Sequence, residues 1–173
     1  MPISISGSGT ITGTSNITIG SSGGTAITVD TNNRVFTPAR PAFLAQAVHT
    51  DANYASGTVL PWPNIIYNNG NCYNTSTNRF TASTSGVYFF SYNVWHSGTT
   101  TNRCYIRING NEVYGGTATR GIHARLGAVG SDSATLSCIL SLNINDYVDV
   151  YHNGDSGNVT LFYANYFTGF QVS

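Results

Sequence analysis

Apolar and polar residues alternate in short runs after residue 41, and turn-forming residues separate these runs. In residues 134–142, Leu136, Cys138 and Leu140 share one strand face, as a sheet with one buried side requires, while Ile139 is apolar on the opposite face. No helical repeat of ten residues is present. The pattern therefore predicts an all-β domain. The clear strand candidates are Ala42–Val48, Ile65–Tyr67, Arg79–Ala82, Val87–His96, Arg103–Asn109, Ala134–Leu142, Tyr147–Tyr151 and Val159–Tyr166.

The first 40 residues carry a different pattern, in which an apolar residue recurs at every eighth position. The repeat positions are Ile3, Ile11, Ile19, Ile27 and Val35. The short β-prone pieces 17–19 and 27–29 each offer an apolar stripe but no core, and Gly, Ser and Asn turns separate them. This pattern predicts a β-rich stem in which three intertwined copies bury the stripe; the alternative is a flexible linker with an accidental period.

A composition change near residue 40 divides the chain into two regions. Residues 1–40 are a Ser, Thr, Gly and Ile-rich stem or anchoring segment, and Phe36 is their only aromatic residue. Residues 41–173 carry all the other aromatic residues and are long enough to close one hydrophobic core. We therefore expect one globular head and an N-terminal segment that needs a partner to become ordered.

Charged side chains are scarce and balanced, which excludes several classes of partner. They make up 8% of the chain, against about 25% in ordinary soluble domains, and the net charge is zero. A nucleic-acid binder that depends on counterion release is therefore excluded, and no polybasic patch serves an anionic membrane. Polar residues interrupt every apolar run, so we expect no membrane insertion. The first residues lack the basic and apolar regions of a secretory signal, so we expect synthesis in a cytoplasm.

Catalytic and cofactor motifs are absent from the sequence, so we expect no enzymatic activity and no cofactor. The four histidines are well separated, without the spacing of a metal site. Cys72, Cys104 and Cys138 are an odd number and lack the close spacing of metal or redox pairs. We interpret them as buried thiols, while a disulfide stays open.

Several motifs occur in an order and at spacings that point to a known family. Pro41-Ala42-Phe43 opens the domain, Asn68-x-Gly70-x-x-Tyr73 leads to Phe80, and Ser85-Gly86-Val87-Tyr88-Phe89-Phe90 follows. The match continues through Ile108-Asn109-Gly110 and Ser133-Ala134-Thr135-Leu136 to the terminal Phe167-x-Gly169-Phe170. This set resembles the C1q globular domain over nearly all of residues 41–173. The resemblance implies a ten-strand jelly-roll sandwich of the C1q/tumour-necrosis-factor type that assembles as a homotrimer. Asn145-Asp146 stands where Gly-Asp is usual in the family, which affects one turn.

The matched motif residues are suited to architecture rather than chemistry. The large aromatic side chains can fill the space between two sheets or seal contacts between subunits. Gly86 and Gly169 are expected where crowding leaves no room for a Cβ. Trp95, which lies in an aromatic strand, is also expected in the core. The structural residues of the motif set are Phe43, Tyr73, Phe80, Gly86, Tyr88, Phe90, Gly169 and Phe170.

Exposed aromatic and arginine side chains in loops are the candidate recognition groups, because they make rigid contacts to sugars and carboxylates. The candidates are Trp62, Tyr114, Arg120, His123 and Arg125. Four of them lie in residues 114–125, the longest segment with little alternation, which is either a binding loop or an inter-subunit loop. The turn around Asp155 offers oxygen ligands for calcium, the alternative being a simple polar hairpin turn.

A repetitive stem ahead of such a head is similar to fibre, appendage and head-decoration proteins of bacterial viruses, including those of cyanobacteria. The resulting hypothesis is a virion structural protein at the virion surface, made in the host cytoplasm and released by lysis. Residues 1–40 would contact other virion proteins, and three heads would contact a host surface glycan or protein with avidity from threefold symmetry. Whether it is a fibre tip or a capsid decoration stays open. The alternative is a secreted C1q-like recognition module, a lectin or immune-type binder.

Overall fold

The computed structural model describes residues 16–21, 24–37, 40–47, 52–97, 101–114, 121–127, 131–153, 158–161 and 164–173. The chain divides into two compact units, Met1–Ala39 and Arg40–Ser173. The described residues form strands and turns, without a helix, which confirms the all-β prediction for this part of the chain. None of the described residues therefore belongs to a helix long and apolar enough to cross a membrane.

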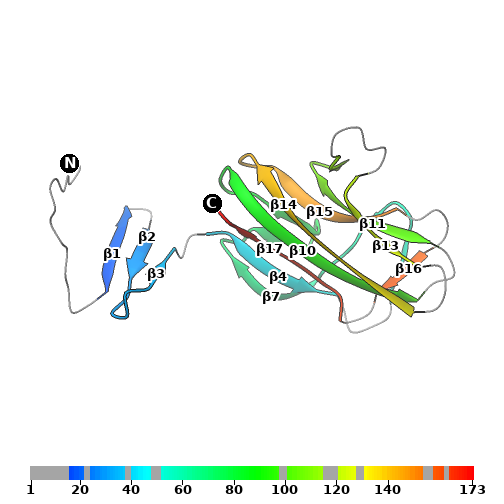
Figure 1. Ribbon diagram of the computed structural model, residues 1–173, viewed down its shortest axis with the longest axis horizontal. Helices are drawn as coiled ribbons and strands as arrows, with labels where there is room; N and C mark the ends of the chain where they lie inside the picture. Colours follow the sequence, from blue (N-terminus) through cyan, green and yellow to red (C-terminus); the bar gives the residue numbers. More distant parts are fainter. Residues whose placement is uncertain are drawn as a thin grey trace. The chain divides into compact units, whose positions relative to one another are not determined.

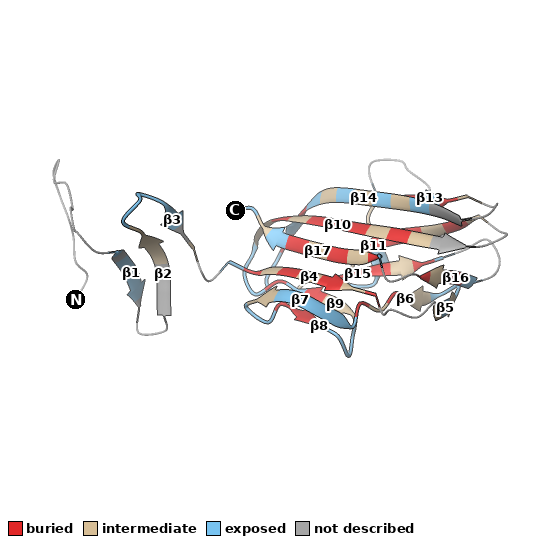
Figure 2. Cartoon of the chain, turned by 90° about the horizontal axis from the view of Figure 1, so that it is seen from below, coloured by how far each residue is buried: buried red, intermediate tan, exposed pale blue. Residues whose placement is uncertain are grey.

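The C-terminal unit contains a five-stranded antiparallel sheet (Figure 1). Its strand order is β14 (Ser131–Leu142), β10 (Gly86–Ser97), β17 (Tyr166–Gln171), β4 (Ala42–Gln46) and β7 (Asn64–Asn69). Buried and more exposed residues alternate along β4, β17, β14 and most of β10, whereas the residues of β7 are exposed or half-buried (Figure 2). The alternation follows from the strand period of two, which sends successive side chains to opposite faces of the sheet.

A second sheet of seven strands lies behind the first. The main path is β12 (Asn111–Glu112), β11 (Asn102–Ile108), β15 (Tyr147–His152), β9 (Arg79–Thr81) and β8 (Tyr73–Asn74). Two further strands join it, β13 (His123–Leu126) beside β11 and β6 (Thr58–Val59) beside β15. A separate pair is formed by β16 (Asn158–Leu161) and β5 (Ala52–Ala55).

Aromatic side chains from both sheets meet in the core. The ring of Phe80 on β9 packs edge-on against Tyr88 and Phe90 of β10, with centroids 5.4 and 5.1 Å apart. Phe43 of β4 stacks on Tyr73 of β8 at 4.8 Å. Such ring pairs add about 0.5–1.5 kcal/mol each beyond the burial of their area. They join the two sheets face to face into a β-sandwich.

Two glycines stand where the packing leaves no room for a side chain. A Cβ at Gly169 would lie 2.4 Å from Cδ1 of Phe90, and a Cβ at Gly86 would lie 2.3 Å from the carbonyl oxygen of Ser173. Both distances are far below van der Waals contact, so any side chain there would displace a core ring or the C-terminal backbone. Asn145, at the position where the family usually has Gly, adopts a φ of 71°. Asparagine tolerates this left-handed conformation, so the turn is kept.

The cysteines are free thiols that face the interior. Cys72 and Cys104 are buried and Cys138 is half-buried. Burial raises the pKa of Cys72 and of Cys138 to about 11, and it raises the pKa of Cys104 as well. The thiolate is the reactive form, so these groups are poor nucleophiles at neutral pH.

The N-terminal unit contains a three-stranded antiparallel sheet of β1 (Ile17–Ser21), β2 (Gly24–Val29) and β3 (Val35–Phe36). The repeat positions Ile19 and Ile27 pair across β1 and β2, and the repeat position Val35 pairs with Val29, which lies two residues after Ile27. Ile19 is 57% exposed and Val35 is 66% exposed within the single chain. The turn between β2 and β3 is held by Asp30, whose carboxylate accepts from the Arg34 guanidinium at 2.6 Å.

Three expectations about the head are wrong. One strand is predicted over Val159–Tyr166, but β16 ends at Leu161 and β17 begins at Tyr166, because Asn165 between them is buried and donates from Nδ2 to the carbonyl of Asn93. The predicted loop 114–125 ends in a strand, since β13 pairs with β11. Trp95 is half-buried rather than in the core, because Val94 takes the inward position.

Phe170 does not fill the space between the sheets. Its side chain is 46% exposed, and its ring lies 5.2 Å from that of Phe89 on the outer face of the five-stranded sheet. Neighbouring residues on β17 take opposite faces, so the buried Phe167 and Gly169 leave Phe170 outside. The other role predicted for the aromatic motif residues, a contact between subunits, stays a prediction for Phe170.

We expect Gly169→Ala to lower the free energy of unfolding by about 1–3 kcal/mol, since the added methyl group overpacks the core against Phe90. Urea denaturation followed by tryptophan fluorescence measures this loss. Ser141→Ala, at an exposed position of the same sheet, serves as control and should change stability by less than about 0.5 kcal/mol. Equal stability of the two variants would contradict the packing argument.

Candidate functional site

The outward face of the seven-stranded sheet carries a row of polar side chains. On β15, Val148 and Val150 point into the core, so the residues between and beside them point outward. The register places Asp149 opposite Arg107 of β11, and Asn74 of β8 opposite Arg79 of β9. The row runs across five strands as Asn74, Arg79, Asp149, Arg107 and Glu112.

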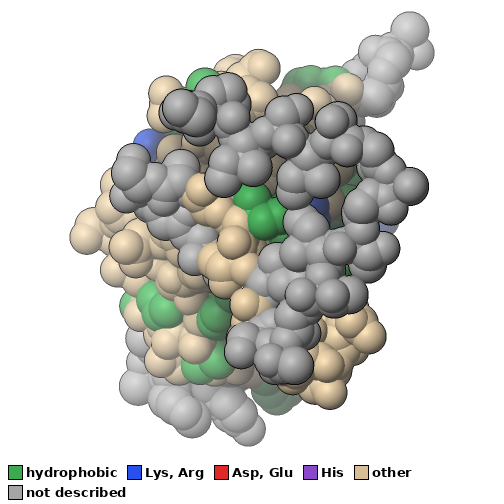
Figure 3. Space-filling view, turned by 90° about the vertical axis from the view of Figure 1, so that its left-hand side faces the viewer, with side chains coloured by type: hydrophobic (Ala, Val, Ile, Leu, Met, Phe, Trp, Pro, Cys, Tyr) green, Lys and Arg blue, Asp and Glu red, His purple; other side chains and the backbone are tan. Residues whose placement is uncertain are grey.

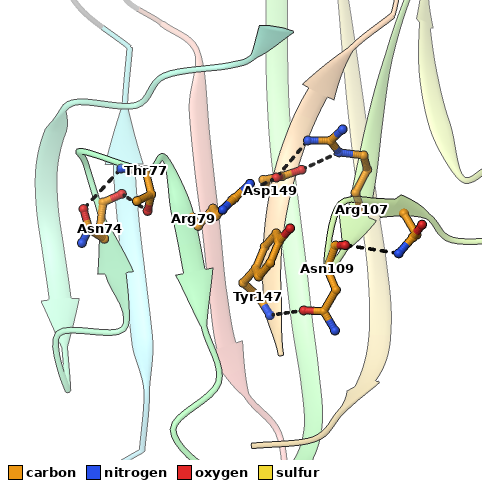
Figure 4. Close-up of polar contacts among 8 residues, drawn as sticks. Asn74, Thr77, Arg79, Arg107, Asn109, Tyr147 and Asp149 are labelled. Atoms are coloured by element: carbon orange, nitrogen blue, oxygen red, sulfur yellow. Dashed lines mark hydrogen bonds and ion pairs between the residues drawn. The ribbon is translucent and has the colours of Figure 1, made fainter. Parts of the chain in front are cut away.

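Asp149 is the centre of this row. Arg107 donates from Nε to Oδ1 of Asp149 at 2.7 Å and from Nη2 to Oδ2 at 3.0 Å, a two-pronged contact (Figure 4). Arg79 donates from Nε to Oδ2 at 3.4 Å. The Asp149 carboxylate has no exposed surface, whereas the side chain of Arg79 is 36% exposed. The two arginines therefore cover the carboxylate, and of the two side chains that of Arg79 is the more open to solvent, since that of Arg107 is 13% exposed.

Two tyrosine rings hold the arginines from the side. The guanidinium carbon of Arg79 lies 4.0 Å from the ring centroid of Tyr147, and that of Arg107 lies 3.7 Å from the ring of Tyr151. Both distances allow a cation–π attraction of about 0.5–2 kcal/mol. Each arginine is therefore fixed both by an ion pair and by an aromatic ring.

Asparagine side chains order the end of β15 beside Tyr147. Asn109 Oδ1 accepts from the backbone N–H of Tyr147 at 3.0 Å (Figure 4). Asn109 Nδ2 donates to Oδ1 of Asp146 at 2.7 Å. This second bond, together with the backbone N–H of Asn143, lowers the pKa of Asp146 below its ordinary value. The turn before β15 is therefore held by a carboxylate that must be ionised.

The charges of the row are arranged unevenly. Arg79, Asp149 and Arg107 together carry one net positive charge, in a chain whose total is zero. Glu112 at the β12 end accepts from the hydroxyl of Tyr114 and from the backbone N–H of Gly121, both at 3.1 Å. The negative charge of Glu112 lies beside Arg107, while Arg79 has the neutral Asn74 as its outer neighbour. An anion is therefore favoured at the Arg79 end.

The five-stranded sheet has an outer face of the opposite character. Its register brings Ile139, Phe89 and Phe170 into one row across β14, β10 and β17. Ile139 is 66% exposed in the single chain. The neighbouring row of Ser137, Ser91 and Thr168 is small and polar, and Ser137 donates to Ser91 at 2.9 Å. Figure 3, which shows the left-hand side of the view in Figure 1, has hydrophobic side chains in separate patches among the described residues.

The structure changes the picture for the predicted recognition residues. Trp62 is fully buried and packs near Phe167, so its prediction as an exposed binding residue is wrong; the chain around it folds under the sheet edge before β7. Tyr114 is 54% exposed, and its hydrogen bond to Glu112 raises its pKa. His123 and Arg125 lie on β13, half-buried and exposed, respectively.

Tyr114 contacts the row through Glu112, and His123 lies beside the row next to Tyr105. The His123 ring lies 4.9 Å from that of Tyr105, which is opposite Tyr151 in the register. His123 Nδ1 is 2.7 Å from the carbonyl oxygen of Gly121. Tyr105 and Tyr151 form a second row of aromatic side chains, which borders the row of Arg107 and Asp149.

Arg120 and Asp155 lie outside the described residues, so the calcium turn and one arginine candidate stay predictions. Within the described ranges, no group of three or more His, Cys, Asp or Glu side chains is placed to hold a metal ion. The sequence analysis missed Arg79, Arg107 and Asp149. A signal for them existed in the Tyr-Val-Asp-Val-Tyr run, where a carboxylate stands between two valines on a strand.

Comparisons with known proteins define the class and then the family. The head has the fold of three solved structures: the globular domain of zebrafish complement 1qA (17% identity, TM-score 0.57, 78% of this chain and 98% of that one), murine APRIL at pH 5.0 (12%, 0.57, 77% and 99%) and Eiger TNF from S. frugiperda (8%, 0.57, 78% and 94%). The C1q domain family matches residues 42–172, so the chain belongs to that family. No curated protein matches the chain.

We expect Asp149→Asn to lower the free energy of unfolding of the C-terminal unit by about 3–5 kcal/mol, because it leaves two arginines without their buried counter-ion. Chemical denaturation measures the loss. Asp30→Asn, which breaks the exposed pair with Arg34 in the N-terminal unit, should leave that transition unchanged. A loss below about 1 kcal/mol would mean that the tyrosines alone hold the arginines.

We expect the head to become less stable in acid, because protonation of Asp146 removes the stability that its ionised carboxylate provides. Its pKa is lowered in the folded state from the ordinary 3.8, so its contribution is complete above that value and disappears as the pH falls through the folded pKa. The difference in melting temperature between the wild-type chain and Asp146→Asn should be constant near neutral pH and narrow below pH 3.8. A difference that is independent of pH would contradict this assignment.

Proposed function

We propose that this protein is a non-enzymatic homotrimer in which one sheet of each head forms the subunit contacts and the other sheet faces outward for recognition. The observation that carries the proposal is the exposed apolar row of Ile139, Phe89 and Phe170 on the five-stranded sheet. Apolar residues that line up across three strands mark an association surface rather than scattered exposure.

The contrast between the two outer faces supports this division of roles. The five-stranded sheet offers apolar and small polar side chains, which suit contact with another copy of the chain. The seven-stranded sheet offers Arg79, whose side chain is 36% exposed and suits reversible contact with a polar partner. Threefold symmetry would present three copies of that face and give avidity without new contacts.

In this proposal the N-terminal unit is the stem of the trimer. Its three-stranded sheet is too small to bury an apolar face by itself, and Ile19 and Val35 are largely exposed in the single chain. Three copies brought together by the heads would bury these repeat positions against one another. The stem would also be the part that contacts other proteins of the assembly.

As its biological setting, we propose a virion structural protein, a trimeric fibre tip or capsid decoration that contacts the host surface. The eight-residue apolar repeat ahead of a C1q domain and the low charge support this setting. Cryo-electron microscopy of virions from the source tests it. Threefold density of matching size on the capsid or appendages is the expected result. Particles that lack the protein would overturn the virion setting and favour a secreted recognition module.

We expect Ile139→Arg to convert trimers to monomers, because it places a charge in the apolar row. Sedimentation equilibrium at a fixed protein concentration measures the mass. Thr75→Arg, on the exposed β8–β9 hairpin of the other sheet, adds the same charge away from the row and should stay trimeric. A wild-type chain that sediments as a monomer would overturn the proposed assembly.

A further inference from the structure

We propose that Arg79 binds the carboxylate of an acidic sugar, so that the outward face of each head recognises a carboxylated polysaccharide. The inference deepens the proposed function and rests on it for the outward orientation of the seven-stranded sheet. The row Asn74, Arg79, Asp149, Arg107 and Glu112 supplies the binding groups.

Arg79 has donors to spare. Its Nε is engaged by Asp149, and its guanidinium carbon lies over the Tyr147 ring. Among the residues that the structure describes, Nη1 and Nη2 of Arg79 have no partner. Two adjacent N–H donors in one plane match the two oxygens of a carboxylate, which is the strongest arrangement that an arginine offers to an anion.

The position of Arg79 is fixed before any ligand arrives. The buried carboxylate of Asp149 holds the guanidinium from one side and Tyr147 limits its movement from the other. A side chain already held in the bound geometry loses little conformational freedom on binding, and this favours affinity. Arg107 is less suited because two of its nitrogens are used by Asp149 and Glu112 stands next to it.

The charge of the site favours a carboxylate over more highly charged groups. Arg79, Asp149 and Arg107 carry one net positive charge, which one carboxylate at the Arg79 end neutralises, and Glu112 at the other end of the row makes the row neutral as a whole. Beyond Arg79, Asn74 stands opposite in the register and its Nδ2 has no partner among the described residues. Asn74 and Thr77 border Arg79 on the β8–β9 hairpin, and Asn109 lies on the far side of Tyr147 (Figure 4). Amide and hydroxyl groups of this kind suit the hydroxyls of a sugar.

The test uses the full chain and immobilised polygalacturonate, a sugar polymer with one carboxylate on each ring. Its methyl ester, which has the same rings without charge, is the matched ligand control. Biolayer interferometry compares the wild-type chain with Arg79→Gln, Arg79→Lys and Arg40→Gln. The last variant removes the same charge from an exposed position outside the row, where Arg40 donates to the carbonyl of Val172.

We expect wild-type binding to the acid form alone, at least about tenfold weaker binding by Arg79→Gln and an intermediate value for Arg79→Lys, which keeps the charge but loses the two-donor geometry. Arg40→Gln should bind as the wild type does. Binding of the ester, or equal loss in Arg79→Gln and Arg40→Gln, would overturn the assignment. Thermal unfolding of each variant confirms that binding is compared between folded chains.

Sedimentation of the same samples separates this inference from the proposed function. A trimer that does not bind the acid form would overturn the sugar site and leave the assembly standing. A monomer that binds through Arg79 would overturn the assembly and leave the site standing. Binding and assembly can be tested separately because all residues of the row belong to one chain.

Discussion

The aromatic layer between the two sheets is the constraint on which the rest of this structure depends. Phe80 contacts Tyr88 and Phe90 from the opposite sheet, and it fixes which residues of each strand point inward. Because successive side chains of a strand point to opposite faces, the residues that point into the core also determine which residues point outward. Gly169 keeps the layer closed by leaving room for Phe90. The apolar row on one sheet and the arginine row on the other are therefore consequences of how the core is packed.

The two outer faces differ in how their side chains are stabilised, and this difference supports their different roles. On the five-stranded sheet, the apolar side chains of Ile139 and Phe170 contribute favourable free energy of burial only when a second surface covers them. On the seven-stranded sheet, the ion pairs of Asp149 are already complete, and the arginines remain hydrated at their outer ends. A permanent contact suits the first face and a reversible contact suits the second.

The sequence predicted much of the head because its local signals agree with its core. Alternation located most of the predicted strands to within two residues but missed the short strands β5, β6, β8, β12 and β13, and the motif around Tyr88 and Phe90 led to the family. Failures occurred where local and tertiary preferences differ. Trp62 stands between two prolines and looks like an exposed loop residue, yet it is fully buried. His123 lies on a strand because β11 offers it a partner, which no local signal encodes.

The sequence by itself determined the all-β class, the division of composition near residue 40, the scarcity of charge and the facing of side chains along each strand. Only the tertiary structure decided which strands are neighbours. Asp149, Arg107 and Arg79 lie on three separate strands, 42 and 70 residues apart in the chain, and hydrogen bonding between the strands brings them into one row. Alternation gives the face on which a side chain lies, but strand pairing gives its neighbours, and pairing is a property of the whole packed sheet.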